Sequence, residues 1–336
     1  MTRKFLPITG FVLITGVADR LHAAVVIDQV FVGDAGNAAD TRVMDSDQTS
    51  GYGSVGYAYW ISQNETTVSQ YAEFLNAVAA TDTYGLYNTG MAMGIVNGIT
   101  RNGVSGGYSY AVAPGSGNMP VTFVSWFDAA RFCNWLQNGQ PVGQQNATST
   151  EDGAYTLNGA VSGNSITRNV GATIWIPSED EWYKAAYYDP GKDSGAGGYW
   201  LQANHSDLAG DNTVGNIGSS NFYDGDYVGY PGLSLTEAGA YGPGSQSAYG
   251  TNDQGGNVFE WNDSVIGSSR GLRGGSWDYT DHYLSSISRG DFEPTEETHN
   301  VGFRVAGSNQ IMLVPEPDAA ALIGAAGMIL LVRRKR

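Results

Sequence analysis

The sequence predicts an α+β domain that is low in regular secondary structure and rich in loops. Glycine supplies 47 of the 336 residues, charged residues make up 15%, and hydrophobic residues make up 41%. This hydrophobic share is enough for a buried core, whereas so much glycine favours turns and irregular backbone. Two segments also show a short strand pattern that leads directly into a helix pattern. Together these observations predict short strands and helices joined by long loops in one domain.

The first ordered segment covers residues 57–80. It begins with a short aromatic strand, after which Thr66 or Thr67 can cap a helix, because a threonine hydroxyl accepts a hydrogen bond from a free backbone N–H of the first turn. Apolar residues then recur at helical spacing from Val68 to Val78. We therefore expect an amphipathic helix directly after the strand.

Two further segments each combine a strand with a helix that starts at a capping box, in which a serine and an acidic residue three positions later bond to each other's backbone N–H groups. The strands are expected at 121–124 and 173–176, and the capping pairs are Ser125 with Asp128 and Ser178 with Glu181. Beyond residue 189 the chain is irregular, with strands expected only at 257–261, 271–277 and 301–305.

Cys133 is the only cysteine, so no internal disulfide can form. It lies in the expected second helix, on the same side as Ala129, Ala130 and Leu136. This apolar setting favours a core position over a nucleophile.

The formal net charge is −16. The two ends, residues 1–23 and 315–336, hold seven of the 17 basic residues and three of the 33 acidic ones. The net charge of residues 24–314 is therefore −20, from 10 basic and 30 acidic residues. A surface of this charge excludes nucleic acid as a partner and suits cations.

The two ends are predicted to be targeting segments rather than parts of the fold. Arg3 and Lys4 precede an apolar run, which predicts a secretory signal peptide over residues 1–23. At the other end, Pro315-Glu316-Pro317 leads into the apolar stretch 319–332 and four basic residues. This tail, residues 315–336, resembles the PEP-CTERM sorting signal, which an exosortase reads and then removes; a plain membrane anchor is the alternative. The resemblance implies a protein exported through the inner membrane to the cell envelope, outer surface or extracellular matrix of a Gram-negative bacterium.

The domain between these ends, 24–314, carries six short motifs in a characteristic order. They are 64-NETT-67, 120-PV-121 with 124-VSW-126 and 133-CNWL-136, 176-IPSE-179 with 181-EW-182, 256-GNVFEW-261, 273-RGGSW-277 and 302-GFR-304. In this order they resemble the formylglycine-generating enzyme (sulfatase-modifying factor) family, which has a variant of the C-type lectin fold. The resemblance covers about residues 25–307.

Enzymes of this family oxidise a substrate cysteine with two copper-binding cysteines that follow the Gly-Gly-Ser motif. In this chain those positions fall near Tyr279 and Leu284, so both catalytic cysteines are absent and no copper is expected. Whether the chain is an enzyme is open, with a non-catalytic role favoured. Glu260, Arg273 and Arg304 are expected to form a buried charge network rather than a catalytic group.

The resemblance also implies structural calcium. Asp253, the carbonyls of Gly256 and Val258, and Glu260 match one family site, since calcium prefers carboxylate and carbonyl oxygens. A second site begins at Asn221 and the carbonyl of Phe222, and Asp226 is added as a further ligand. The three histidines that follow the predicted signal, His205, His282 and His299, lack helical metal spacing and are expected to be scattered on the surface.

The aromatic residues suggest where a ligand contacts the domain. Four tryptophans, Trp126, Trp135, Trp182 and Trp261, lie within motifs and are expected in the core. Ser276, Trp277, Tyr279 and Tyr283 border the position of the family's active site and are the candidates for ligand contact.

Two functions remain open from the sequence. The favoured one is a cell-surface module without catalytic activity that binds an extracellular polysaccharide or a surface protein. The alternative is a divergent metal-dependent oxidoreductase, or a modifier of an exported protein substrate, on the retained scaffold.

Overall fold

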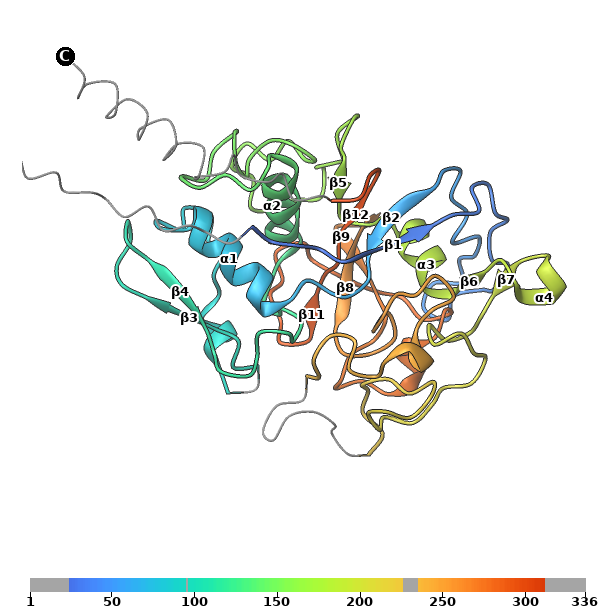
Figure 1. The fold of residues 1–336 in the computed structure, drawn as a ribbon. Helices are drawn as coiled ribbons and strands as arrows, with labels where there is room; N and C mark the ends of the chain where they lie inside the picture. The colour runs from blue at the N-terminus through green and yellow to red at the C-terminus, as the bar shows by residue number, and fades with distance from the viewer. Residues whose placement is uncertain (1–23, 95, 226–234, 312–336) are drawn as a thin grey trace, which may run out of the picture.

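A computed structural model describes residues 24–94, 96–225 and 235–311 of the chain (Figure 1). The predicted signal at 1–23, the predicted tail with Pro315-Glu316-Pro317, and Asp226 lie outside the described residues. Within the described ranges, no helix has both the length and the apolar character that a membrane crossing requires.

Three helices begin where the sequence analysis expects them. In each, the N-cap hydroxyl accepts from the third backbone N–H, and the side chain at that position bonds back to the N-cap, which confirms the predicted boxes at Ser125 and Ser178 and selects Thr67 over Thr66. The helices are α1 (Val68–Val78), α2 (Trp126–Gln137) and α3 (Glu179–Tyr187), followed by a single turn, α4 (Lys192–Gly195). Short 3₁₀ turns occur at Thr89–Ala92, Pro243–Ser245 and Asp281–Leu284.

The strands are short, and in the described part of the chain they form two four-stranded sheets and two hairpins. The first sheet has the order β1 (Gln29–Val32), β2 (Tyr59–Ser62), β12 (Ala306–Gly307) and β5 (Ile174–Trp175). The second has the order β10 (Gly290–Phe292), β9 (Ser269–Arg273), β8 (Phe259–Ile266) and β11 (Val301–Gly302). The hairpins are β3 (Ile99–Asn102) with β4 (Ser109–Val112), and β6 (Tyr188–Asp189) with β7 (Gly198–Tyr199).

Strand pairing brings distant parts of the chain together. β2 pairs with both β1 and β12, so the first and last strands of the described chain share one sheet. β11 pairs in parallel with β8, with Val301 opposite Phe259 and Gly302 opposite Glu260. This pairing places the 302-GFR-304 motif against the 256-GNVFEW-261 motif.

The strand expected at 121–124 does not form. Phe123 has a φ of 57°, in the left-handed region that interrupts an extended chain. The backbone N–H groups here bond to two different segments, Val121 to the carbonyl of Thr66 and Phe123 to the carbonyl of Thr298. Tertiary contacts therefore override the β propensity of this apolar run.

The strands expected at 257–261 and 271–277 are displaced. β8 starts at Phe259 and continues to Ile266, because it forms a hairpin with β9 around Gly267, whose φ is 61°. β9 ends at Arg273, because Gly274 and Gly275 take φ values of 99° and 70°, which turn the chain out of the extended conformation.

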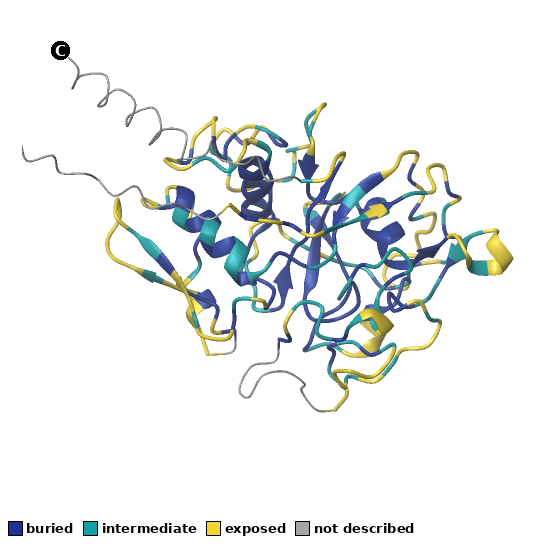
Figure 2. Cartoon of the chain, in the orientation of Figure 1, coloured by how far each residue is buried: buried dark blue, intermediate teal, exposed yellow. Residues whose placement is uncertain are grey.

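The core lies between the two sheets and the helices α1 to α3, and Figure 2 shows buried residues along these elements with exposed residues at the β3–β4 hairpin and at α4. All four tryptophans expected in the core are buried. Cys133 is fully buried in α2, as expected, and burial raises the pKa of its thiol well above the usual value. A second, smaller core packs around α3 and includes Met44, Trp182, Tyr183 and Tyr199.

Candidate functional site

A tight turn after β9 shapes the region where the family's active site is expected. A Cβ atom at Gly275 would lie 2.8 Å from a methyl carbon of Leu284 and 3.0 Å from the carbonyl carbon of Tyr283. A Cβ atom at Gly274 would lie 3.0 Å from the carbonyl oxygen of Gln254. Glycine at 275 therefore lets the turn pack closely against residues 283–284, and glycine at 274 lets it pack against Gln254.

Ser276 is fully buried, and its hydroxyl donates to the carboxylate of Asp278 at 2.6 Å. The other oxygen of Asp278 lies 3.0 Å from Nε2 of His299, and Asn300 donates to the same carboxylate. In a serine nucleophile the histidine lies next to the hydroxyl and the carboxylate lies behind it. Here the carboxylate lies between the two, so His299 does not act as the base for Ser276.

The four ligand-contact candidates differ in their access to solvent. Ser276 and Trp277 are buried, and the Trp277 ring packs edge-on against His299 at 5.5 Å. Tyr279 is partly buried, whereas Tyr283 is 39% exposed. The structure therefore leaves the two tyrosines as the candidates that a large ligand can reach.

Tyr279 and Tyr283 form an aromatic cluster with Phe259 of β8. The two tyrosine rings are 4.8 Å apart at 82°, and Phe259 lies 5.1 Å from Tyr279 and 6.3 Å from Tyr283. Edge-to-face packing of this kind holds each ring in one orientation. The cluster is thus a packed, partly exposed aromatic surface built from β8 and the segment after β9.

The positions that match the family's two catalytic thiols cannot supply thiol chemistry. Tyr279 belongs to the aromatic cluster, and Leu284 is 3% exposed and packs beneath Gly275. The thiol of Cys133 lies in the core with a raised pKa, because burial disfavours the thiolate.

The residues predicted to bind calcium lie close together, but they are already engaged with other groups. Glu260 is fully buried and accepts from Arg304 with both oxygens, at 2.6 and 2.7 Å, and from the Trp182 indole at 2.7 Å. Asp253, with a φ of 56°, accepts from the backbone N–H of Gly239 at 2.5 Å.

Gly256 and Val258 continue this predicted site along the chain, and the second predicted site packs directly against it. The backbone N–H of Asn257 donates to the carbonyl of Asn221, and the carbonyl of Phe222 accepts from Asn212. A Cβ at Gly256 would lie 2.3 Å from the carbonyl oxygen of Asn221, so glycine is required at this contact.

A third buried carboxyl group, that of Glu65, lies in the same region. Burial and the nearby charges of Asp253 and Glu260 raise its pKa well above the usual value. One of its oxygens accepts from Asn257 at 3.1 Å, and the other has no hydrogen-bond partner among the described residues. Burial and the charge of Glu260 also raise the pKa of Asp253 to about 6.

The three carboxyl groups face one guanidinium, that of Arg304, so near neutral pH Asp253 and Glu260 leave an excess of negative charge that suits a cation, while Glu65 favours its protonated form. They do not converge as a preformed cage, since the described residues contain no group of three His, Cys, Asp or Glu side chains arranged to hold a metal. A calcium ion here would depend on Asp253 and backbone carbonyls more than on Glu260.

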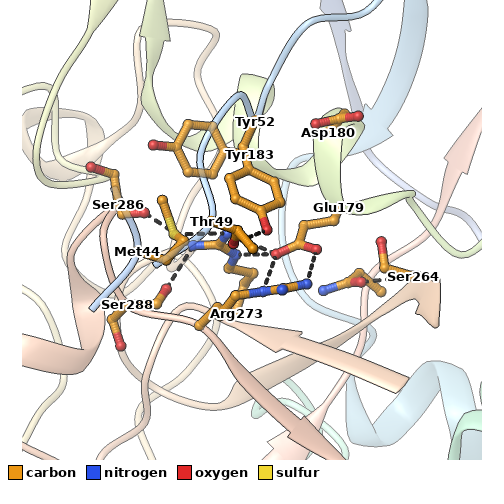
Figure 3. Close-up of polar contacts among 12 residues, drawn as sticks. Met44, Thr49, Tyr52, Glu179, Asp180, Tyr183, Ser264, Arg273, Ser286 and Ser288 are labelled. Carbon is orange, nitrogen blue, oxygen red and sulfur yellow. Dashed lines mark hydrogen bonds and ion pairs between the residues drawn. The ribbon is translucent and has the colours of Figure 1, made fainter. Parts of the chain in front are cut away.

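The expected network of Glu260, Arg273 and Arg304 proves to be two separate ion pairs. Arg273 bonds not to Glu260 but to Glu179 of α3, at 2.7 Å, and to the carbonyls of Ser286 and Ser288 (Figure 3). The sequence could not show this, because Glu179 lies 94 residues away and its position depends on how α3 packs on β8 and β9.

The three described histidines are separated, as expected, and each faces a different aspartate. His205 lies 2.7 Å from Asp189, and His282 lies 3.5 Å from Asp45. His299 lies 3.0 Å from Asp278. Each side chain is at least 37% exposed, so these are surface pairs rather than metal ligands.

The sequence analysis gave no site role to four residues that contact the ligand candidates or one another: Asp278, His299, Asn300 and Phe259. Phe259 lies within the 256-GNVFEW-261 motif, and His299 lies just before the 302-GFR-304 motif. Their closeness to these motifs was the only sequence signal that could have pointed to them. The contacts of Phe259, His299 and Asn300 with residues 276–283 join distant segments, and β11 pairs with β8 beside them, which no local pattern specifies.

Similar folds occur among solved structures. Treponema denticola variable protein 1 is 19% identical over 84% of this chain and 95% of that chain, with a TM-score of 0.50. CarF is 21% identical over 84% of this chain and 98% of that chain, with a TM-score of 0.49. PvdO from Pseudomonas aeruginosa is 16% identical over 84% of this chain and 94% of that chain, with a TM-score of 0.48. At 19% identity the first likeness concerns the fold alone.

A comparison with curated protein sequences gives no significant match. The family described as "Sulfatase-modifying factor enzyme 1-like domain" matches residues 29–309, which is most of the chain and includes all six motifs. The α+β, loop-rich architecture is that of the formylglycine-generating enzyme variant of the C-type lectin fold. The chain therefore belongs to the sulfatase-modifying factor (formylglycine-generating enzyme-like) family.

Proposed function

We propose that this family member is a non-catalytic binding module of the bacterial cell surface. It presents the aromatic cluster of Phe259, Tyr279 and Tyr283 to an extracellular polysaccharide or a surface protein. The observation that carries the proposal is the replacement of both thiol positions, because Tyr279 and Leu284 leave an aromatic surface where family enzymes bind copper.

A polysaccharide is the first ligand to test, because its sugar rings stack on exposed aromatic faces. Tyr283 is 39% exposed and its ring is held edge-to-face by Tyr279, so little conformational entropy is lost when a sugar packs on it. The neighbouring His282 is exposed and can donate or accept hydrogen bonds at the edge of this surface.

Calcium is proposed as a structural ion that braces the loops behind this surface. The excess negative charge of Asp253 and Glu260 over the one guanidinium of Arg304 supports a cation, and the carbonyls of Gly256 and Val258 would complete its ligands. Its role would be to hold the 253–258 turn, with no part in a reaction.

Export and anchoring are proposed from the ends of the chain alone. The predicted signal at 1–23 would direct export through the inner membrane. The tail at 315–336 would be read by an exosortase at Pro315-Glu316-Pro317, or would anchor the chain in the membrane directly. Either outcome leaves the domain in the cell envelope or extracellular matrix.

The experiment is a glycan array probed with the full chain, with and without calcium, beside two variants. Tyr283→Ala removes the exposed ring of the aromatic cluster. Phe31→Ala is the matched control, because Phe31 is a 52% exposed aromatic residue on β1, outside the cluster. Element analysis of the same preparation measures calcium, copper and iron.

We expect glycan binding that Tyr283→Ala weakens about tenfold, a loss of roughly 1.4 kcal/mol, and that Phe31→Ala leaves unchanged. Absence of binding to every glycan and to extracted surface proteins would count against the module. Equal effects of the two variants would remove the aromatic cluster from the proposal, and stoichiometric copper or iron would support the enzyme alternative instead.

A further inference from the structure

A cavity of about 370 Å³ lies far along the chain from the aromatic cluster, between the loop at residues 38–42 and the β6–β7 hairpin. Small-molecule sites begin at roughly 300 Å³, so this volume is enough for a small ligand. Figure 1 shows α4 and β7 at the edge of the molecule, and Figure 2 shows the residues of α4 exposed. The cavity is lined by Ala38, Ala39, Asp40, Thr41, Arg42, Tyr188, Lys192, Asp193, Ala196, Gly197, Gly198 and Tyr199.

Tyrosines and glycines shape this cavity. The rings of Tyr188 and Tyr199 are 5.1 Å apart at 63°, and both tyrosines are largely buried. The hydroxyl of Tyr199 donates to the carbonyl of Ala38 at 2.8 Å, which ties the 38–42 loop to β7. A Cβ at Gly197 would lie 2.2 Å from the Tyr188 hydroxyl oxygen, so only glycine allows the backbone this close to the ring.

Three charged residues of the cavity, Asp40, Arg42 and Lys192, are already paired, whereas Asp193 is exposed. Arg42 bonds to Asp40 at 2.9 Å and to the carbonyl of Tyr199 at 3.0 Å. Asp40 also accepts from the hydroxyl of Tyr183 at 2.8 Å. Lys192 lies 3.2 Å from Asp207, with its ammonium over the Trp200 ring. An anionic ligand would therefore meet no uncompensated positive charge, and the acidic surface of the protein would repel it.

The backbone at the mouth of the cavity is strained. Asp193 and Ser194 both adopt left-handed conformations, with φ values of 53° and 61°, which residues with side chains seldom take in succession. A Cβ at Gly198 would lie 2.8 Å from a carboxylate oxygen of Asp193, so glycine at 198 makes room for this carboxylate. Strain of this kind is concentrated where a side chain must be held for a ligand.

We propose that this cavity binds a neutral sugar ring. Sugar hydroxyls both donate and accept, so they match a small cavity that offers the Asp193 carboxylate, the Thr41 hydroxyl and those N–H groups of Arg42 and Lys192 that their ion pairs leave unused. The alanine and glycine walls let the ring approach the backbone. The site is separate from the aromatic cluster and would give the chain a second contact with a saccharide, which goes beyond the proposed function.

Saturation-transfer NMR on the full chain tests this, with D-glucose, D-galactose and N-acetylglucosamine as neutral probes and D-glucuronate as the acidic one. Ala196→Trp fills the cavity from an exposed position, and Val170→Trp places the same side chain at an exposed site that does not line it. Asp193→Asn keeps the shape of the side chain but removes its charge. Thermal melting of each variant reports whether the fold is retained.

We expect at least one neutral sugar to bind the wild type and Val170→Trp, with binding lost in Ala196→Trp and weakened at least about tenfold in Asp193→Asn. Tyr283→Ala should bind the sugar normally, which separates this site from the proposed function. If Ala196→Trp fails to fold, Asp193→Asn decides. The proposal is overturned if no neutral sugar binds at about 10 mM, if only glucuronate binds, or if the folded cavity variants bind like the wild type.

Discussion

Replacement of Arg304 by methionine is expected to destabilise the domain strongly. All five N–H donors of Arg304 are in use, two to Glu260 at 2.6 and 2.7 Å and three to the carbonyls of Ser62, Gln63 and Asn252 at 2.8–3.2 Å. The side chain is fully buried. Methionine fills much of the volume but leaves Glu260 with the Trp182 indole as its remaining partner, beside the carboxylates of Glu65 and Asp253.

Removing one partner of a buried ion pair costs about 3–5 kcal/mol of unfolding free energy, because the other charge stays buried without compensation. Urea denaturation of the full chain measures this cost. Arg42→Met is the control and should cost less, because Arg42 is 31% exposed, its side chain makes two hydrogen bonds rather than five, and Asp40 keeps the Tyr183 hydroxyl as a partner. In the Arg304→Met background, Glu260→Gln should restore part of the loss by removing the unpaired charge.

Two results would refute this reasoning. One is a loss of unfolding free energy in Arg304→Met that is no larger than the loss in Arg42→Met. The other is a further loss, rather than a recovery, when Glu260→Gln is added, because this would mean that the charge of Glu260 is not the source of the cost.

Three further predictions concern calcium, glycine and the thiol. Without calcium, the unfolding free energy should fall as the pH rises from about 4 to about 6, because folding raises the pKa of Asp253 from 3.8 to about 6 and so favours its protonated form. Calcium at about 100 times its dissociation constant should add about 2.7 kcal/mol of unfolding free energy near pH 7.5 and less at pH 5. It should add nothing in Asp253→Asn, and thermal melting measures each of these effects. Gly256→Ala should cost at least about 2 kcal/mol in urea denaturation, because φ is 91° and the Asn221 carbonyl blocks the methyl group, and an unchanged midpoint would contradict this. Cys133 should react with a thiol reagent only after denaturation, because it is fully buried with a raised pKa, and fast labelling of the native chain would show that α2 opens.

The parts of the fold that the sequence predicted well depend on local interactions. The capping boxes at Ser125 and Ser178 are complete within four residues, so each helix start is visible without knowledge of the rest of the chain. The apolar face of α1 and the burial of Cys133 follow from helical spacing in the same way. The order of six motifs then identified the family, which the match over residues 29–309 confirms.

The displaced elements depend on contacts between distant segments. Residues 121–124 have a strand composition, but their N–H groups bond to Thr66 and Thr298, and Phe123 turns into the left-handed region. The longer β8–β9 hairpin exists because Gly267 turns the chain, although polar residues at 262–264 hide the strand in the sequence.

The sequence by itself determined the family, the absence of the catalytic thiols, the acidic character and the helix starts, because these are properties of composition or of residues close along the chain. Only the tertiary structure decided that Arg273 bonds to Glu179, that Asp278 separates Ser276 from His299, and that a cavity lies between the 38–42 loop and the β6–β7 hairpin. The reason is physical. Each of these features joins groups that are brought together by the packing of sheets and loops, and such packing is set by the whole buried core rather than by any local pattern.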